Sequence, residues 1–134
     1  MVVLAEDVLP IESDDDVVRV RQQTRARAIE CGLRLVEQTK IVTAASELAR
    51  NTLVHGQGGS MTLELLDDGH RRGLRLTFAD DGPGIGDIEL ALRPGFTTGT
   101  GLGLGLSGSR KLVDEFSIQS TPGRGTRVTA VKWK

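Results

Sequence analysis

The sequence predicts an α+β fold in which a layer of helices covers one face of a sheet. Two observations indicate this class. Two long segments in the first half have apolar residues at helical spacing, and later segments form two pairs of strands joined by turns. Because strands joined by tight turns are antiparallel, these pairs favour a mixed, largely antiparallel sheet over a parallel array that alternates with helices.

Length and composition favour a single domain spanning residues 1–134. Of the 134 residues, 38% are hydrophobic and 26% are charged, as in ordinary globular domains. The formal net charge of -1 offers no global attraction to nucleic acid or to an anionic membrane. The first residues do not resemble a signal peptide, no apolar stretch is long enough to span a membrane, and the single Cys31 cannot form an internal disulfide. We therefore expect a cytoplasmic protein with no nucleic-acid or membrane partner.

The first strand and the first helix have clear local signals. Residues 2–11 include several β-branched side chains and favour a strand. Ser13 is a suitable N-cap, and the acidic residues after it suit the first turn of a helix that keeps one apolar face up to Gly32. The arginines of this helix are interpreted as a solvated face, with a partner-binding surface as the alternative: Arg19, Arg21, Arg25 and Arg27.

A second helix and a hairpin follow. The helix is predicted at about 36–55, where apolar residues recur at helical spacing and Gly56 can end it. The hairpin has strands at 60–66 and 73–79 around a turn of Asp67, Asp68 and Gly69. A glycine-rich loop at 80–86 and a short helix at 87–92 come next.

The last third begins with a run in which glycine recurs at almost every second position, residues 95–108. Because glycine weakens helices and strands, such a run favours contact between the backbone and a ligand. A helix is predicted at about 104–115, with Leu106, Val113 and Phe116 facing the core. Two strands at 116–120 and 126–133, joined by a turn with proline and glycine, complete the chain.

Two familiar phosphate-binding patterns do not explain this run. The P-loop pattern is absent, because the basic and hydroxyl residues after the glycines have neither its spacing nor its order. Gly103, Gly105 and Gly108 satisfy the G-x-G-x-x-G dinucleotide pattern formally. However, the run follows a loop rather than a strand, and Val128 stands where an acidic residue that binds ribose would be expected. We therefore set both sites aside.

Three separated stretches account for the glycines when they are considered together. They are ELARN at 47–51, DDGPGI at 80–85 and GTGLGLGL at 99–106. In this order and at these spacings they resemble the N, G1 and G2 boxes of the GHKL ATPase and kinase superfamily, and GRGT at 123–126 resembles the short motif near the end of that fold. The resemblance covers nearly the whole chain. It implies the Bergerat fold, a two-layer sandwich of helices on a mixed, largely antiparallel sheet.

Within the superfamily, the sequence resembles the RsbT-type serine kinases of bacterial stressosome signalling. The stretches SELARN, DDGPGI, GLGLGLSGSRKLVDEFSIQST and AVKW carry this similarity. Histidine kinases usually join this fold to a phosphorylatable helical hairpin, for which the sequence leaves no room. The resemblance implies an acceptor on a separate protein, a serine or threonine of a STAS-domain antagonist or scaffold. It also implies that the released kinase binds and activates a downstream phosphatase or other effector.

Glu47 and Asn51 are the candidate catalytic and metal-binding residues. They are four residues apart on the second predicted helix, so their side chains share one face about one turn apart. The amide oxygen of Asn51, the only asparagine in the chain, is a suitable hard ligand for Mg²⁺ that bridges a triphosphate. By the resemblance, Glu47 is the general base that orients the acceptor hydroxyl.

The remaining candidates bind ATP. At the end of a strand, the carboxylate of Asp80 can accept a hydrogen bond from the adenine amino group. Gly82 and Gly84 let the backbone pass close to the purine, Ile85 packs on the ring, and the resemblance adds Thr126. In the glycine run, free amides and a helix N-terminus suit the phosphates. These residues are Gly99, Thr100, Gly101, Leu102, Gly103, Leu104 and Gly105. Asp81 departs from the usual surroundings of the purine by adding a second carboxylate.

The leading hypothesis is therefore a Mg-ATP-dependent serine/threonine kinase that acts on a STAS-domain protein. Two alternatives remain open. One is a nucleotide-gated anti-sigma factor that sequesters a sigma factor, as in similar sporulation and general-stress kinases. The other is a stand-alone ATPase, which would hydrolyse ATP without an acceptor.

Overall fold

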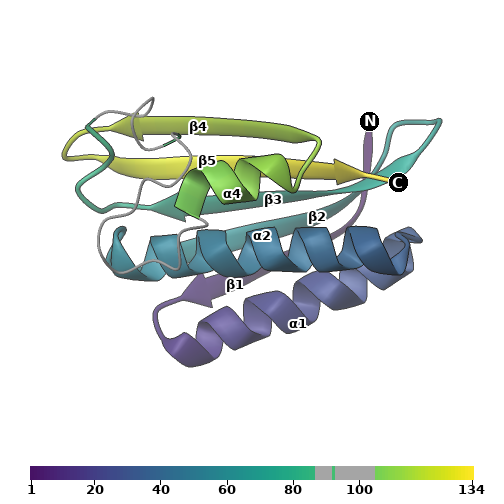
Figure 1. The fold of residues 1–134 in the computed structure, drawn as a ribbon, viewed down its shortest axis with the longest axis horizontal. Helices are drawn as coiled ribbons and strands as arrows, with labels where there is room; N and C mark the ends of the chain where they lie inside the picture. Colours follow the sequence, from purple (N-terminus) through teal and green to yellow (C-terminus); the bar gives the residue numbers. More distant parts are fainter. Residues whose placement is uncertain (87–91, 93–104) are drawn as a thin grey trace.

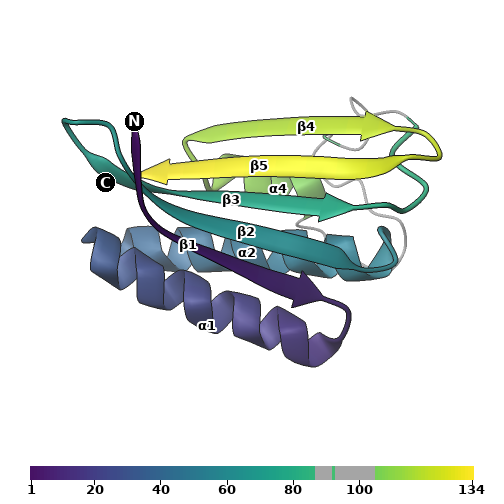
Figure 2. The same cartoon turned by 180° about the vertical axis from the view of Figure 1, so that it is seen from behind.

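The computed structural model describes residues 1–86, 92 and 105–134. Its five strands form one sheet in the order β1-β2-β3-β5-β4, and every pairing is antiparallel. The strands are β1 (Val2–Ile11), β2 (Gly59–Asp67), β3 (Arg72–Asp80), β4 (Glu115–Thr121) and β5 (Gly125–Trp133). The helices α1 (Asp14–Cys31), α2 (Leu35–Val54) and α4 (Gly105–Lys111) lie on one face of this sheet, and Figure 2 shows the opposite face, which no described helix covers. The predicted α+β, two-layer class is confirmed, with a sheet that is antiparallel where a mixed one was expected.

Helix α1 begins and ends at the residues that the sequence indicates. The side chain of Ser13 accepts a hydrogen bond from the backbone N–H of Asp16, and three aspartates form the first turn. At the other end, Gly32 adopts a left-handed conformation with φ 88°, and its N–H returns to the last carbonyls of the helix.

Helix α2 ends differently from the prediction. Both His55 and Gly56 donate their backbone N–H to the carbonyl of Asn51, but neither has a positive φ. The left-handed turn comes later, at Gln57 (φ 62°) and Gly58 (φ 100°). Gly56 is therefore not needed to end the helix. A side chain is excluded there because a β-carbon would lie 2.4 Å from Cγ of Asp80.

The core lies between the helix layer and the sheet. The buried side chains of α1 and α2 pack against the inward-facing residues of the central strands. The largest fully buried hydrophobic residues are Ile11, Val20, Ile41, Leu48, Met61, Leu63, Leu65, Leu66, Leu74, Leu76 and Phe78. Among the described residues, no helix is both long and apolar enough to cross a membrane.

Helix α4 is shorter than the predicted helix at 104–115. The backbone N–H of Leu112 bonds to the carbonyl of Ser109, which closes the last turn, and Asp114 is held by β5. Its N–H donates to Val131, and its carboxylate accepts the N–H of Trp133. Val113 therefore lies outside the helix, whereas Phe116 lies in strand β4, as the predicted strand at 116–120 requires. Of the predicted helix at 87–92 only Leu92 is described, and the glycine run up to residue 104 lies outside the described residues.

Candidate functional site

Three strand ends meet at one end of the sheet and bring two predicted residues together. Asp80, the last residue of β3, pairs with Thr126 in β5, and Thr126 pairs on its other side with Ser120 in β4. Because all three side chains arise from one row across the sheet, a carboxylate and two hydroxyls lie side by side. The resemblance predicts Asp80 and Thr126 at one site, and the register of the strands places them there.

The carboxylate of Asp80 is held in one orientation by glycine backbone. Its Oδ1 accepts the N–H of Gly82 at 2.9 Å. A β-carbon at position 56 would lie 2.5 Å from Oδ2, and one at position 82 would lie 2.6 Å from the carbonyl oxygen of Gly56. Among the described residues, no hydrogen bond reaches Oδ2. This oxygen is available to accept a hydrogen bond from a ligand.

The loop after Asp80 is fastened to the turn between β4 and β5. Gly84 has φ 77°, and a β-carbon there would lie 2.5 Å from the carbonyl oxygen of Thr121. The carbonyl of Pro83 accepts the N–H of Gly123 at 2.7 Å. Ile85, partly buried, packs against the core. The structure thus brings the predicted residues of the G1 loop next to Thr126.

Ser120 is a site residue that the sequence reasoning missed. Its hydroxyl oxygen accepts the N–H of Ile85 at 2.7 Å and lies 3.1 Å from the carbonyl oxygen of Gly125, to which it donates. It also lies 2.9 Å from the hydroxyl of Thr126. One signal was available: Ser120 continues the inward alternation of Phe116 and Ile118, where an apolar residue is expected.

Glu47 and Asn51 lie on α2, one turn apart and both partly buried. Their separation of four residues corresponds to a rise of about 6 Å along the helix axis. Leu48 and Thr52 beside them are buried, which fixes this part of α2 against the core. Five residues after Asn51, Gly56 touches Asp80, so the chain itself links the N box to the G1 loop.

The third predicted group lies largely outside the described residues. This holds for Gly99, Thr100, Gly101, Leu102, Gly103 and Leu104, whereas Gly105 is the first residue of α4. Helix α4 packs beside α2, and its Leu106 belongs to the core cluster. Helix α4 therefore packs on α2, the helix that carries Glu47 and Asn51.

A hollow of about 700 Å³ borders the site on the side of the α2–β2 connection. Asp80 and Asp81 line it together with Glu12 and the glycine-rich segment 56–59. Asp81 is exposed and opens to solvent. Asp81, which departs from the family pattern, therefore adds a negative charge at the rim of the site.

The donors and acceptors present suit a purine nucleotide and its metal ion. A purine edge that carries an amino group matches Oδ2 of Asp80, which no described residue bonds, next to the hydroxyl of Thr126. Among the described residues, no group of three His, Cys, Asp or Glu side chains could hold a metal ion. Magnesium on a triphosphate needs only one or two protein oxygens, because phosphate and water supply the rest. Asn51, with Glu47 one turn away, fits that requirement.

Comparison with known proteins agrees with this geometry. Residues 36–134 match the family described as histidine kinase-, DNA gyrase B-, and HSP90-like ATPase. The chain is 43% identical over 123 residues to the serine/threonine-protein kinase RsbT of Bacillus subtilis (strain 168), covering 92% of each chain. It is also 33% identical over 119 residues to the anti-sigma F factor of Thermoanaerobacter sp. (strain X514), covering 84% of this chain and 82% of that protein.

A solved structure shares the fold. The crystal structure of the RsbU and RsbW domains of a Mycobacterium tuberculosis protein superposes with a TM-score of 0.68 at 22% identity. The match covers 97% of this chain and 33% of that chain, so the present protein spans about a third of its length. The solved structure shows the fold, and the sequence matches place the chain among the histidine kinase-, DNA gyrase B-, and HSP90-like ATPases and, within them, among the RsbT-type serine/threonine-protein kinases.

Proposed function

We propose that this protein transfers the γ-phosphate of ATP to a serine or threonine of a STAS-domain antagonist or scaffold protein in the cytoplasm. Residues 1–134 act as one domain in this proposal. Once released, the kinase binds and activates a downstream phosphatase or other effector, as a switch between partners. The observation that carries the proposal is the carboxylate of Asp80. It is fixed by Gly82 and Gly56 and is paired across the sheet with Thr126, and its Oδ2 forms no hydrogen bond with the described residues.

Recognition of the nucleotide is assigned to the strand ends. Oδ2 of Asp80 accepts a hydrogen bond from the adenine amino group, which a guanine in the same position lacks. Thr126, held by Ser120, adds a polar contact next to it. Ile85 packs on the ring, and Gly82 and Gly84 keep the loop backbone close to it. Binding of the phosphates is assigned to residues 99–105, whose backbone amides can donate hydrogen bonds to the phosphate oxygens.

Phosphoryl transfer is assigned to the face of α2 that carries Glu47 and Asn51. Asn51 holds Mg²⁺, which neutralises charge on the triphosphate when it is bound. Glu47 accepts the proton of the acceptor hydroxyl while the oxygen of that hydroxyl forms a bond to the γ-phosphorus. The bond between that phosphorus and the oxygen bridging to the β-phosphate breaks, and ADP leaves. The chain therefore supplies a base, a metal ligand and positioning.

The test is transfer from labelled ATP to purified STAS-domain proteins in the presence of magnesium. The wild-type protein is expected to label its acceptor, and Glu47→Gln to lower the rate by a factor on the order of 10² to 10⁴. Nucleotide affinity, measured by calorimetry, should change little in this variant. Glu6→Gln is the matched control, because Glu6 is exposed on β1. Full transfer by a folded Glu47→Gln protein would remove Glu47 from the mechanism.

The magnesium assignment has its own readout. Asn51→Ala is expected to raise the magnesium concentration needed for tight ATP binding. The affinity for ATP measured in excess chelator should stay nearly the same, because only the metal-dependent part of binding is lost. An unchanged magnesium requirement in Asn51→Ala would contradict the assignment.

The similarity to anti-sigma F factors favours a second candidate function, capture of a sigma factor. Pull-down with sigma factors and STAS proteins, in ADP and in ATP, separates the two. Capture of sigma factors alone would favour the second function. Release of phosphate from ATP at the full rate without any acceptor would instead indicate a stand-alone ATPase.

A further inference from the structure

A second hollow lies at the opposite end of the sheet from Asp80. It has a volume of about 820 Å³ and is bordered by the α1–α2 connection, the β2–β3 hairpin and the end of β5. Its wall includes Arg72, the first residue of β3, whereas Asp80 is the last residue of that strand. At the usual rise per residue in a strand, the two sites are roughly 27 Å apart along β3. This hollow, which we name the hairpin hollow, therefore belongs to neither the nucleotide nor the transfer site.

The cationic side chains that line the hairpin hollow, Arg34, Arg71, Arg72 and Lys134, outnumber its carboxylates, Glu37 and Asp67. Arg34 and Lys134 line it, and neither makes an ion pair with the described residues. Arg72 reaches the carboxylate of Asp67, which also lines the hollow, only at 4.0 Å. The carboxylate of Glu37, which also lines the hollow, is already bonded to Lys132 at 2.6 Å. Cationic groups thus face the hollow without a short-range partner.

The backbone of α2 adds to this positive field. Arg34 is the N-cap residue of α2, and no side chain caps the helix there. The first N–H groups of a helix and the positive end of its dipole favour a negative ligand. Because Arg34 and Glu37 both line the hairpin hollow, the start of α2 lies at its wall.

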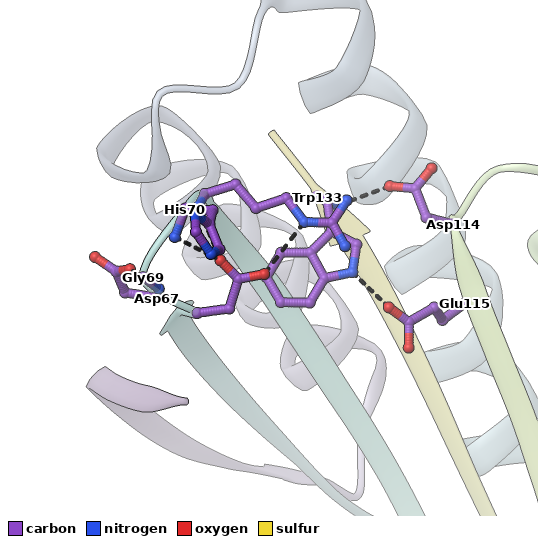
Figure 3. Close-up of polar contacts among 8 residues, drawn as sticks. Asp67, Gly69, His70, Asp114, Glu115 and Trp133 are labelled. Carbon is purple, nitrogen blue, oxygen red and sulfur yellow. Dashed lines mark hydrogen bonds and ion pairs between the residues drawn. The ribbon is translucent and has the colours of Figure 1, made fainter.

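The hairpin hollow also has a fixed aromatic wall. The ring of Trp133 lies across the backbone of Gly73, where a β-carbon would be 2.5 Å from the ring. The guanidinium of Arg71 stacks on the ring, with 4.2 Å between Cζ and the ring centroid. Figure 3 shows the indole N–H donating to Glu115, and the backbone N–H of Trp133 donates to Asp114. Tryptophan and arginine are among the residue types most enriched where proteins bind one another strongly.

We propose that the hairpin hollow binds an acidic segment of a partner protein. Carboxylates of that segment pair with Arg34, Arg72 and Lys134, and its chain packs on the edge of Trp133. The volume exceeds what one phosphate fills, and cations spread along the wall suit a chain with several negative charges better than a single ion. The inference goes beyond the proposed function, because this second site does not require that ATP be the substrate.

The chain carries its own reporter for the test. Trp133 is the only tryptophan and there is no tyrosine, so its emission reports on the hairpin hollow alone. The probe is hexaglutamate with both termini blocked, titrated into the full chain at low ionic strength and followed by fluorescence and by calorimetry. We expect saturable binding. Arg34→Gln should weaken it about fivefold, and Arg34→Gln combined with Arg72→Gln should weaken it further.

A charge-matched control separates specific from general attraction. Arg25→Gln removes the same charge from the exposed side of α1 and is expected to leave hexaglutamate binding unchanged. Nucleotide affinity should be the same in all three variants, which also checks their folding. The proposal is overturned by the absence of heat and emission change, by equal weakening in Arg25→Gln, or by equal binding of hexalysine. Inorganic phosphate that binds as tightly as hexaglutamate would also overturn it, since the site would then recognise a small ion.

Discussion

The carboxyl group of Asp80 occupies the space that a β-carbon at position 56 would need, because such a carbon would lie 2.4 Å from Cγ of Asp80. Asp80 ends β3, whereas Gly56 follows α2, so this contact joins the sheet to the helix layer at the candidate nucleotide site. A change at either residue therefore acts on the other.

Gly56→Ala is expected to weaken ATP binding by about tenfold or more. The added methyl group forces the side chain of Asp80 to rotate, which breaks its bond to the N–H of Gly82. The fold should persist, because Gly56 does not have a positive φ. Calorimetry with ATP gives the affinity. Gly86→Ala is the control, since a β-carbon there meets no atom of the described residues within 4 Å. Equal affinity in the two variants would contradict the role given to this contact.

Ser120→Ala is expected to lower the free energy of unfolding by about 1–3 kcal/mol, because its hydroxyl serves three partly buried partners. It should also weaken ATP binding, since the backbone N–H of Ile85 and the hydroxyl of Thr126 both lose their hydrogen bond to Ser120. Urea denaturation and calorimetry measure the two effects. Ser117→Ala, an exposed serine on the same strand, should change neither quantity. A variant as stable as the wild type would show that water replaces the hydroxyl without loss.

Two buried threonines, Thr24 and Thr52, are expected to respond differently when valine replaces them. The hydroxyl of Thr24 is fully buried in α1 and forms no hydrogen bond with the described residues. Thr24→Val should therefore keep stability or raise it by up to about 1 kcal/mol. The hydroxyl of Thr52, also buried, donates to the carbonyl of Leu48 at 2.9 Å, and Thr52→Val should cost about 1 kcal/mol. Urea midpoints compare the two variants. Equal losses would mean that Thr24 also has a partner.

The ion pair between α1 and β1 predicts a dependence on pH. Arg27 donates to both oxygens of Asp7, at 2.7 and 3.1 Å, and these bonds lower the pKa of Asp7 below its ordinary value of 3.8, although burial acts the other way. A lowered pKa in the folded state adds stability above pH 3.8 that is lost as pH falls through the folded value. Arg27→Met should cost about 1–2 kcal/mol at neutral pH.

The difference between wild type and Arg27→Met should shrink as the solution becomes more acidic than pH 3.8. Urea denaturation across a pH series measures this difference. Asp7→Asn should remove the same pH dependence, because it lacks the group that titrates. A gap between wild type and Arg27→Met that stays constant into strong acid would assign the stability to packing rather than to the charge of Asp7.

The sequence predicts most of the fold because several elements have local signals. Ser13 and Gly32 define α1, and the Asp67–Gly69 turn defines the first hairpin. The end of α4 is not predicted: the helix stops at Lys111, and Val113 lies in the connection to β4, where the backbone of Asp114 is held by β5. Apolar spacing alone does not mark this end, because it depends on contacts with a strand distant in the sequence.

The candidate site shows the same division. Asp80 and Thr126 are predicted only through the resemblance, and they meet because of the register between β3 and β5. The place of Ser120 depends on the register between β4 and β5, which pairs it with Thr126. The role of Gly56 depends on the close approach of the end of α2 to the end of β3. The local sequence marks Ser120 only as a polar residue at an inward position of its strand, and it does not mark the contact of Gly56 with Asp80.

The position of β5 inside the sheet has a consequence for biosynthesis. Of the five described strands it is the last to be made, yet it lies between β3 and β4 and supplies the partner of Asp80. While the ribosome is still adding residue 125 onward, β3 has an open edge and the carboxylate of Asp80, which we propose binds the purine, lacks its neighbour Thr126. A nascent chain therefore cannot acquire a complete nucleotide pocket before β5 has emerged, and its exposed edge is a natural target for chaperones during that interval.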